Sequence, residues 1–377
     1  MKIAPFSIEQ FFAQYEFSTP HILCASDCES MSISELLHMT DSSMDDFAAL
    51  RLNYTESQGS VEMRTAVSAL YPRTRPDHVV ALAAPEEGIY LAMRTLLDPG
   101  DHVVVLTPAY DSLLNLAETI SGNVSKWEVQ PTADGWAIDL DQLARLVTPQ
   151  TKLIIVNFPH NPTGFLPTLA EFDAIIALAA AHDSWLFCDE MYRGLERDVA
   201  DRLPSAAGRY GRSITLSGLS KVHGLPGLRT GWLLIEDETV REELINWKHY
   251  TSICPPAPSE FLATAVLHHH HKFADRNRAI IRENLAIADA FFARWPDLFT
   301  WRPPQAGSIA LVELHQPSAT AYCHQLVADA GVLLLPSSCL GYGDGHVRMG
   351  FGRKTFARDL AQYEKQLKLE HESNSTE

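Results

Sequence analysis

Between residues 79 and 235 the chain alternates short apolar runs with stretches of helical periodicity. The apolar runs are 79–83, 102–106, 152–157, 185–188, 213–217 and 232–235. Most of them are continuous, which is typical of strands that are covered on both faces. Helical stretches lie between them at 86–97, 111–120, 169–181 and 240–250. This alternation predicts a doubly wound, mainly parallel α/β sheet, in which ligands bind at the carboxyl ends of the strands.

The segments on either side of this region predict a second, smaller α+β domain. Before it, residues 8–15 have helical spacing, and Ser32 followed by Glu35 marks a helix start. The proline-rich run 254–258 is a stiff break. After the break the pattern predicts a long helical segment at 259–294, strands at 308–314 and 332–335, and helices at 320–330 and 355–369. We therefore expect an N-terminal arm and part of the small domain in 1–50, a large domain in 51–253, a small domain in 254–370, and a disordered polar tail in 371–377.

Charge and composition exclude several classes of protein. The net charge of the 377-residue chain is −17, which argues against nucleic acid or an anionic membrane as a partner. No apolar run approaches the ~18 residues that a membrane helix needs. The N-terminus has no secretion signal, and the six cysteines form no CxxC pair, so we expect reduced thiols and a cytoplasmic protein. The histidine run 268–271 resembles a metal site, but adjacent helical residues point in different directions, so a solvated surface run is the better interpretation.

Candidate chemistry begins in the glycine-rich stretch 217–232, which follows an apolar run. It carries Lys221 and, eight positions later, Arg229. A desolvated lysine can lose its proton and form a Schiff base, whereas arginine stays charged and suits a phosphate dianion. The two side chains together match an aldehyde cofactor that bears a phosphate; a solvated surface loop is the alternative.

Two further strand ends carry polar residues. In the segment 157–164, two X-Pro steps restrict the backbone, so the Asn161 amide can be held rigidly; a simple turn is the alternative. Asp189 ends the run 185–188, and Tyr192 lies three residues further on. Asp189 can cap the next helix, or it can be kept ionised by a cationic ring nitrogen. Because these positions follow parallel strands, we expect them to meet at one edge of the sheet.

The motifs Asn161-Pro162-Thr163-Gly164, Asp189-Glu190-Met191-Tyr192 and Ser220-Lys221 with Arg229 and Gly231-Trp232 follow one another in this order. As a set they resemble the class I/II aminotransferases of fold type I, which use pyridoxal 5′-phosphate (PLP). The resemblance covers most of the chain, from about residue 54 to about residue 353. It implies a PLP-dependent enzyme that transfers the amino group of an L-amino acid to a 2-oxo acid.

The resemblance implies a role for each residue around the cofactor ring. Lys221 would carry the cofactor as a Schiff base and then move the Cα proton of the substrate. Asp189 would pair with the protonated ring nitrogen. Tyr192 and Asn161 would hydrogen-bond the phenolic oxygen. Ser220, next to the lysine, falls within the cofactor-binding set.

Other positions match the family at the edges of the site. Arg229 would bind the phosphate, and Tyr110 would stack on the cofactor. Arg348 would bind the substrate α-carboxylate in bidentate fashion. Tyr54 would reach the phosphate of a neighbouring subunit, which implies a homodimer with shared active sites.

The segment before the second large-domain helix departs from the family, which often presents a glycine and a small residue there. Pro85 has no N–H to give to the phosphate. The phosphate would then rely on the amides of Ala84 and Glu86 and on the helix N-terminus.

A second departure lies three residues before the lysine. The family often has a serine at that position, touching the phosphate, and this chain has Gly218. Ser217 or Ser220 would then substitute for it.

The substrate is less constrained than the cofactor. Some members with this motif set act on guanidino substrates without net transamination. Asp27 and Glu29 fall where the family lays a segment against the substrate, and two carboxylates there could bind a cationic side chain. That both acids are solvated or cap a helix is an equally good interpretation.

Three classes of function follow from these motifs. The first is an aminotransferase, and the second is a PLP-dependent lyase, cyclase or oxidase that acts on an amino acid, including a basic or guanidino one. The third is an effector-sensing module of a transcription regulator, which needs an attached basic DNA-binding domain. We expect the third least, because residues 1–54 are too short and too acidic for such a domain.

Overall fold

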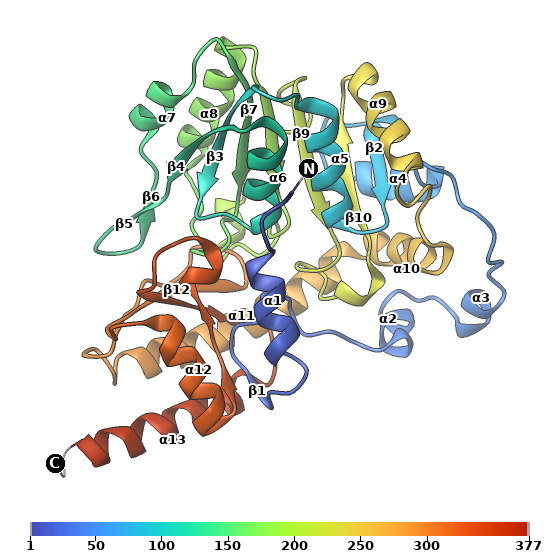
Figure 1. Ribbon diagram of the computed structural model, residues 1–377. Coiled ribbons are helices and arrows are strands. Elements are labelled where there is room, and N and C mark those ends of the chain that lie inside the picture. The colour runs from blue at the N-terminus through green and yellow to red at the C-terminus, as the bar shows by residue number, and fades with distance from the viewer. Residues whose placement is uncertain (1, 375–377) are drawn as a thin grey trace.

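The computed structural model describes residues 2–374, and its centre is a seven-stranded sheet with the order β2-β10-β9-β8-β7-β3-β4 (Figure 1). β10 runs antiparallel to both of its neighbours and the other pairs are parallel. The strands are β2 (Val79–Leu82), β3 (His102–Thr107), β4 (Asn123–Glu128), β7 (Thr151–Asn157), β8 (Trp185–Asp189), β9 (Ser213–Gly218) and β10 (Gly231–Ile235). The predicted fold class, a mainly parallel α/β sheet, is confirmed.

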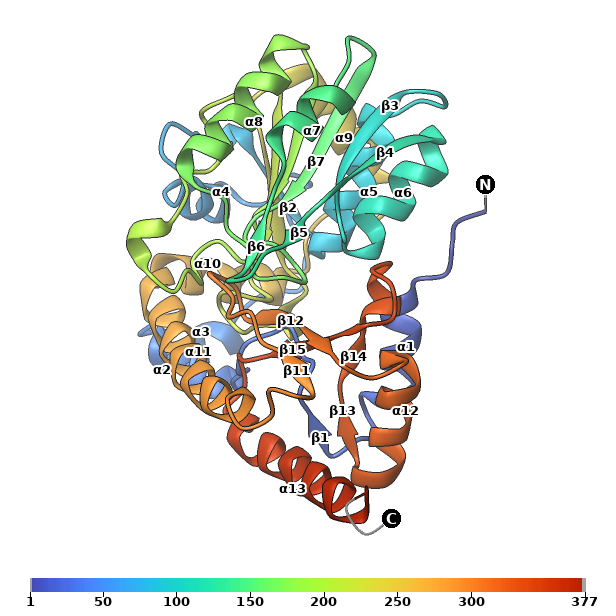
Figure 2. The same cartoon turned by 90° about the vertical axis from the view of Figure 1, so that its left-hand side faces the viewer.

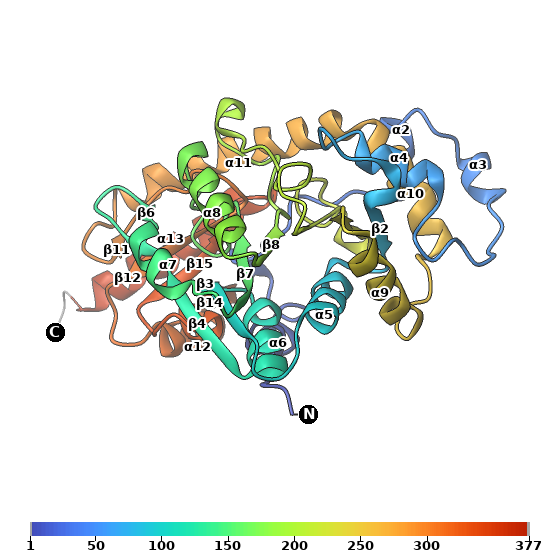
Figure 3. The same cartoon turned by 90° about the horizontal axis from the view of Figure 1, so that it is seen from above.

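Helices cover both faces of this sheet, as Figure 3 shows from above. On one face α5 (Pro85–Leu96), α6 (Asp111–Ser121) and α9 (Glu238–His249) share a buried apolar cluster with the strands. On the other face lie α4 (Val61–Ser68), α8 (Leu169–Ala181) and α10 (Ala257–His268). Because the strands are buried on both sides, nearly every strand position is apolar, and each fully buried aliphatic side chain contributes roughly 1.5–3 kcal/mol.

A four-stranded antiparallel sheet forms the centre of the second part of the molecule, below the large sheet in Figure 2. It consists of β11 (Phe299–Thr300), β12 (Ile309–Leu314), β15 (His346–Gly350) and β14 (Leu335–Pro336). The helices around it are α1 (Ser7–Tyr15), α11 (His270–Phe292), α12 (Ala319–Ala330) and α13 (Phe356–Asn374). The boundaries that the sequence predicts between the two domains stay predictions.

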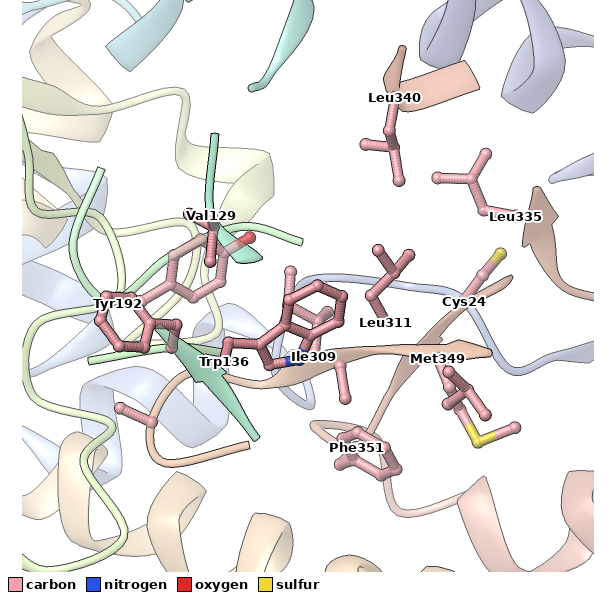
Figure 4. Packing of buried hydrophobic residues seen from close by; sticks show 14 of the residues in the cluster. Cys24, Val129, Trp136, Tyr192, Ile309, Leu311, Leu335, Leu340, Met349 and Phe351 are labelled. Atoms are coloured by element: carbon pink, nitrogen blue, oxygen red, sulfur yellow. The ribbon is translucent and has the colours of Figure 1, made fainter. Parts of the chain in front are cut away.

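The N-terminus of the chain is built into this second part. β1 (His21–Ile22) pairs in parallel with β13 (Val332–Leu333). Cys24 lies in the same buried cluster as Leu311 and Met349 of the small sheet (Figure 4). The remaining elements are α2 (Ile33–Met39), α3 (Met44–Ala48), α7 (Leu140–Leu146), the hairpin β5 (Gln130–Pro131) and β6 (Trp136–Ala137), and the 3-10 turns η1 (Pro76–His78), η2 (Val199–Asp201), η3 (Pro226–Leu228) and η4 (Ser337–Leu340). The predicted start of α2 is confirmed, since Ser32 and Glu35 form a reciprocal capping box.

The long helical segment expected at 259–294 is confirmed. It is divided into α10 and α11, because the backbone leaves the helical conformation at His269. Three other details of the predicted elements differ from the structure. The strand expected at 332–335 is split between β13 and β14, which belong to different sheets. Edge strand β4 was not predicted, since most of its residues are partly exposed and polar. The tail is helical as far as Asn374, and residues 375–377 lie outside the described residues.

The histidine run at the α10–α11 junction also differs from a solvated surface run. His270 is turned inward, and its Nδ1 lies 2.9 Å from Nε2 of His223. Among residues 2–374 no group of three or more histidine, cysteine or acidic side chains could hold a metal ion. No helix in the same range is long and apolar enough to cross a membrane.

Candidate active site

A cavity of about 540 Å³ opens at the carboxyl ends of β7, β8 and β9. Its wall also includes the first turn of α5 and the start of the chain, through Phe6, Glu9 and Ser26. The sequence-predicted site residues that line it are Pro85, Glu86, Tyr110, Asn161, Asp189, Tyr192, Ser220, Lys221 and Arg229. The structure therefore brings together residues that lie up to 144 positions apart in the sequence, as the position of the strand ends predicts.

Lys221 occupies the middle of this cavity, on the loop that joins β9 to β10. Its Nζ donates a hydrogen bond to Oγ of Ser26 at 2.7 Å. Burial lowers the pKa of Lys221 most, Asp27 opposes the shift, and Arg348 adds to it. A lysine with a lowered pKa is available as a nucleophile and as a base.

Asp189 ends β8 and is only 6% exposed. Its Oδ1 accepts a hydrogen bond from the Met191 N–H at 2.9 Å. Burial raises the pKa of Asp189 to about 7, and the Met191 N–H lowers it in part. A cationic group in the cavity would keep this carboxylate ionised, so the position fits a protonated ring nitrogen.

Asn161 and Tyr192 lie on two neighbouring strand ends. The Asn161 N–H donates to Oδ1 of Asn157 at 2.7 Å, which fixes the backbone of the turn. The Tyr192 ring lies with its centroid 6.0 Å from Lys221 Nζ. Its buried hydroxyl has no well-aligned hydrogen-bond partner within residues 2–374; burial raises its pKa, and the nearby Ser26 side chain lowers that pKa only in part. Figure 4 shows Tyr192 beside the packed apolar residues of the small sheet. A phenolic oxygen in the cavity would give this hydroxyl a partner.

Arg348 lies behind Asn161 and is 1% exposed. Its Nη1 donates to Oδ1 of Asn161 at 3.4 Å and its Nη2 to the carbonyl oxygen of Cys24 at 3.1 Å. The guanidinium also lies 5.8 Å from the Phe12 ring centroid, and its buried Nε has no partner in the described part of the chain. Its predicted role with the substrate carboxylate stays a prediction.

The other end of the cavity holds the residues that the sequence predicts to bind a phosphate. Arg229 sits in the left-handed region with φ 51, and its Nη1 donates to the carbonyl oxygen of Pro226 at 3.0 Å. Ala84 is the N-cap of α5, and Pro85 and Glu86 of the first turn line the cavity together with Arg229, so the positive end of this helix lies at this end of the cavity.

Pro85 and Gly218 are coupled in space. A Cβ at Gly218 would lie 2.8 Å from Cγ of Pro85, and a Cβ at Gly231 would lie 2.9 Å from the same atom. Gly218 and Gly231 are directly opposite each other in the β9–β10 pair. The proline ring therefore occupies the space over two glycines, and both departures from the family pattern have one steric cause.

Tyr110 and Tyr54 have different environments. Tyr110 is the residue before α6, packs edge-to-face on Phe6 with centroids 5.1 Å apart, and donates from its hydroxyl to Oε1 of Glu9 at 3.4 Å. Tyr54 is 88% exposed and lies outside the cavity. Its predicted contact with a neighbouring subunit stays a prediction.

Asp27 and Glu29 line a separate groove of about 340 Å³ rather than the cavity. Both carboxylate oxygens of Asp27 bind Arg353, at 3.0 and 3.1 Å, and Oε2 of Glu29 accepts from the Lys354 N–H. The structure thus gives these acids protein partners of their own. Their predicted role with a cationic substrate stays a prediction.

Sequence reasoning did not select Ser26 and Glu9, which do line the cavity. A lone serine or a helical glutamate carries no spacing pattern. The available signal was that Ser26 adjoins Asp27 in a segment already placed against the substrate.

Comparison with known proteins agrees with this geometry. The family model described as "Aminotransferase class I and II" matches residues 32–365. Capreomycidine synthase of Streptomyces vinaceus is 31% identical over 82% of this chain and 80% of its own length. The arginine–pyruvate transaminase of Pseudomonas aeruginosa is 27% identical over 83% and 81%. The solved structure of a PLP-dependent aminotransferase from Streptococcus suis superimposes with a TM-score of 0.92, at 29% identity over 98% of both chains.

The chain belongs to the class I and II aminotransferase family. It is a PLP-dependent aminotransferase with amino acids as small-molecule substrates, which confirms the predicted cofactor and enzyme class. The residues fit the cofactor: a buried carboxyl for the ring nitrogen, a buried hydroxyl without a partner for the phenolic oxygen, and an arginine with a helix N-terminus for the phosphate.

Proposed function

We propose that this aminotransferase acts on L-amino acids whose side chain carries a positive charge. When bound, the cofactor supplies an electron-accepting ring that stabilises negative charge on the substrate Cα. Asp189 keeps the ring nitrogen protonated, while Tyr192 and Asn161 donate hydrogen bonds to the phenolic oxygen. Arg229 binds the phosphate. These roles rest on the family resemblance and on the cavity that gathers the residues.

Lys221 and Arg348 handle the substrate itself. Arg348 binds the α-carboxylate through two parallel hydrogen bonds, which fixes the orientation of the Cα–H bond. Lys221 Nζ then takes the Cα proton, since burial keeps its pKa lowered. Within the same half of the reaction, Lys221 Nζ would pass this proton to the carbon on the cofactor side of the amino nitrogen, which leaves that nitrogen with the cofactor. With the 2-oxo acid acceptor the lysine would move a proton in the opposite direction, back to Cα.

The observation that carries the substrate class is the acidic side of α1. Glu9 lines the cavity, and Glu16 directly follows this helix. Burial raises the pKa of Glu16 most, and the nearby acids Asp27 and Glu9 raise it further. The cations Arg353 and Lys221 lower it in part. A cation from the substrate would stabilise the charged form of a partly desolvated carboxyl such as Glu16, and Glu9 places a second carboxylate in the cavity wall itself. A relative named as an arginine–pyruvate transaminase supports this class of substrate.

A panel of amino acids tests this proposal. The enzyme with PLP and pyruvate is mixed with arginine, lysine, glutamate, alanine or phenylalanine, and the new amino acid is quantified. We expect the highest kcat/KM for a basic substrate. Glu9→Gln should lower kcat/KM for the basic substrate about 10-fold or more, because a charge-assisted contact is worth about 1.5–3 kcal/mol. It should leave kcat/KM for alanine unchanged. The matched control is Glu283→Gln, on an exposed position of α11. Equal losses for basic and apolar substrates contradict the proposed substrate class.

A second candidate is a reaction other than transfer: elimination, cyclisation or oxidation of the same substrates. It is favoured by the relative at 31% identity, which is named as a synthase. The same panel separates the two. Amino-group transfer consumes one pyruvate for each donor molecule. The second candidate leaves pyruvate unchanged; instead it releases ammonia, forms a cyclic product or consumes oxygen.

We also propose a homodimer in the cytoplasm. Leu52, Tyr54 and Tyr250 are 80, 88 and 81% exposed. A 2.7 Å hydrogen bond from Thr55 Oγ1 to the carbonyl oxygen of Pro255 joins the segment after Tyr54 to the segment after Tyr250, and exposed apolar side chains of this kind are typical of protein interfaces. The cytoplasmic assignment rests on the free cysteines. Sedimentation should give twice the chain mass. Mixing Tyr54→Phe subunits with Lys221→Ala subunits should restore activity, because one site of each mixed dimer would then have both native residues. Mixed dimers without activity argue against shared sites.

A further inference from the structure

Residues 23–29, here called the crossing segment, pass between the end of β15 and the lysine loop. The Gly350 N–H donates to the carbonyl oxygen of Leu23 at 2.7 Å, and the Glu29 N–H donates to the carbonyl oxygen of Gly352 at 2.8 Å. The segment is thus attached at both ends to the chain that follows Arg348.

Glycines allow this close approach on both sides. A Cβ at Gly350 would lie 1.8 Å from the carbonyl oxygen of Ala25, and one at Gly352 would lie 2.4 Å from that of Asp27. On the opposite side, a Cβ at Gly224 of the lysine loop would lie 2.6 Å from the carbonyl oxygen of Glu29. The backbone of the crossing segment therefore has no room to shift in either direction.

Ser26 is the residue of this segment that reaches Lys221. Its Oγ accepts the hydrogen bond from Lys221 Nζ at 2.7 Å, and its carbonyl oxygen accepts from Ser308 Oγ at 2.6 Å. The bidentate pair between Asp27 and Arg353 holds the next residue. Ser26 is consequently fixed through its backbone and through its neighbour, and its hydroxyl faces the cavity.

We propose that Ser26 is a positioning residue for Lys221 during proton transfer. Its hydroxyl oxygen accepts one N–H of the uncharged amine, which leaves the nitrogen lone pair directed into the cavity. After the nitrogen has taken the Cα proton, the same oxygen accepts from the ammonium. Because the hydroxyl is neutral, it directs the lysine without changing the charge of the site. This inference rests on the proposed role of Lys221 as the base.

The test is Ser26→Ala, with Ser30→Ala as the matched control, since Ser30 lies just beyond the crossing segment and is exposed. The first readout is a single turnover with the fastest amino acid of the panel, protonated or deuterated at Cα. We expect Ser26→Ala to slow Cα proton transfer about 10- to 100-fold and to raise the deuterium isotope effect. Ser30→Ala should match the unmodified enzyme.

The second readout does not depend on turnover. The visible absorbance of the PLP-loaded enzyme is titrated with pH, and its midpoint reports the protonation of the lysine nitrogen. Ser26→Ala removes a hydrogen bond to the protonated lysine nitrogen, so the midpoint should move about one pH unit lower in this variant. PLP affinity should change less than about twofold.

Ser26→Thr keeps the hydroxyl and should restore both readouts. A threonine variant as impaired as alanine overturns the proposal, because the hydroxyl is then not the cause. The proposal is also overturned if the isotope effect and the titration midpoint of Ser26→Ala equal those of Ser30→Ala. Turnover that survives Lys221→Ala instead shows that the proposed role of the lysine fails, which distinguishes the two failures.

Discussion

The active-site cavity has two walls that are built differently. The floor is formed by strand ends of the large sheet, with Asn161, Asp189 and Lys221. The cover is formed by α1 and the crossing segment, which bring Glu9 and Ser26 from the start of the chain. The floor is held by parallel strand pairing, whereas the cover is held by backbone contacts to glycines.

This difference separates two tasks. The residues that we propose to contact the cofactor lie on the floor, where the hydrogen-bonded ladder fixes their spacing within the large sheet. The residues that we propose to select the substrate or to direct Lys221 lie on the cover. The cover belongs to the second part of the molecule, since β1 pairs with β13 and Cys24 packs in the buried cluster of the small sheet. A change in the cover should therefore alter the reaction while leaving cofactor binding intact.

The largest expected effect comes from Gly350→Ala. Its Cβ would lie 1.8 Å from the carbonyl oxygen of Ala25, so the crossing segment must move. A displacement of about 1 Å can cost about 100-fold in rate, and we expect at least that loss in kcat/KM. PLP affinity, measured by absorbance titration, should change less than about threefold.

Gly345→Ala is the control for this variant, since nothing lies within 4 Å of its Cβ position. Cofactor affinity that falls in parallel with the rate in Gly350→Ala would show that cover and floor are not separable.

A smaller effect is expected on the floor, from Asp189→Asn in the cofactor-free protein. Burial raises the pKa of Asp189 from 3.8 to about 7. The folded state therefore binds this proton more tightly than the unfolded state does. The free energy of unfolding of the native chain is unaffected by Asp189 below pH 3.8, falls as the pH rises from 3.8 to 7, and stays lowered above pH 7. The melting temperature of Asp189→Asn relative to the native chain should rise over this interval and then level off. A constant difference contradicts the raised pKa, and added PLP should reduce the difference.

The smallest effect is expected from Asp27→Asn. The ion pair with Arg353 is partly exposed, with side chains 19 and 29% accessible, so its loss should cost at most about 1 kcal/mol in chemical denaturation. KM for basic amino acids should change less than about threefold, well below the effect of Glu9→Gln. A selective rise in KM as large as that of Glu9→Gln would instead make Asp27 a substrate ligand.

The floor could be predicted from the sequence because buried strands are continuous apolar runs, and the polar residue that ends each run marks the site. The cover could not, because Ser26 and Glu9 reach the cavity only after residues 21–29 have paired with segments more than 300 positions away. Edge strand β4 was missed for a related reason: its half-exposed residues have the polarity of a loop. Gly350 and Gly352 are the sequence features that relate to this contact, since glycine permits a close backbone approach. The sequence does not show which segment approaches them, so the contact could not be predicted.

Pro85, Gly218 and Gly231 bear on how sequences of this kind can diverge. The proline ring fills the space that a side chain at either glycine would need. Replacing Gly218 by serine alone would force the strand pair apart, and replacing Pro85 alone would leave a gap beside the phosphate end of the cavity. The three positions should therefore covary among relatives, and a sequence of this kind that acquires a serine at position 218 would first have to lose the proline.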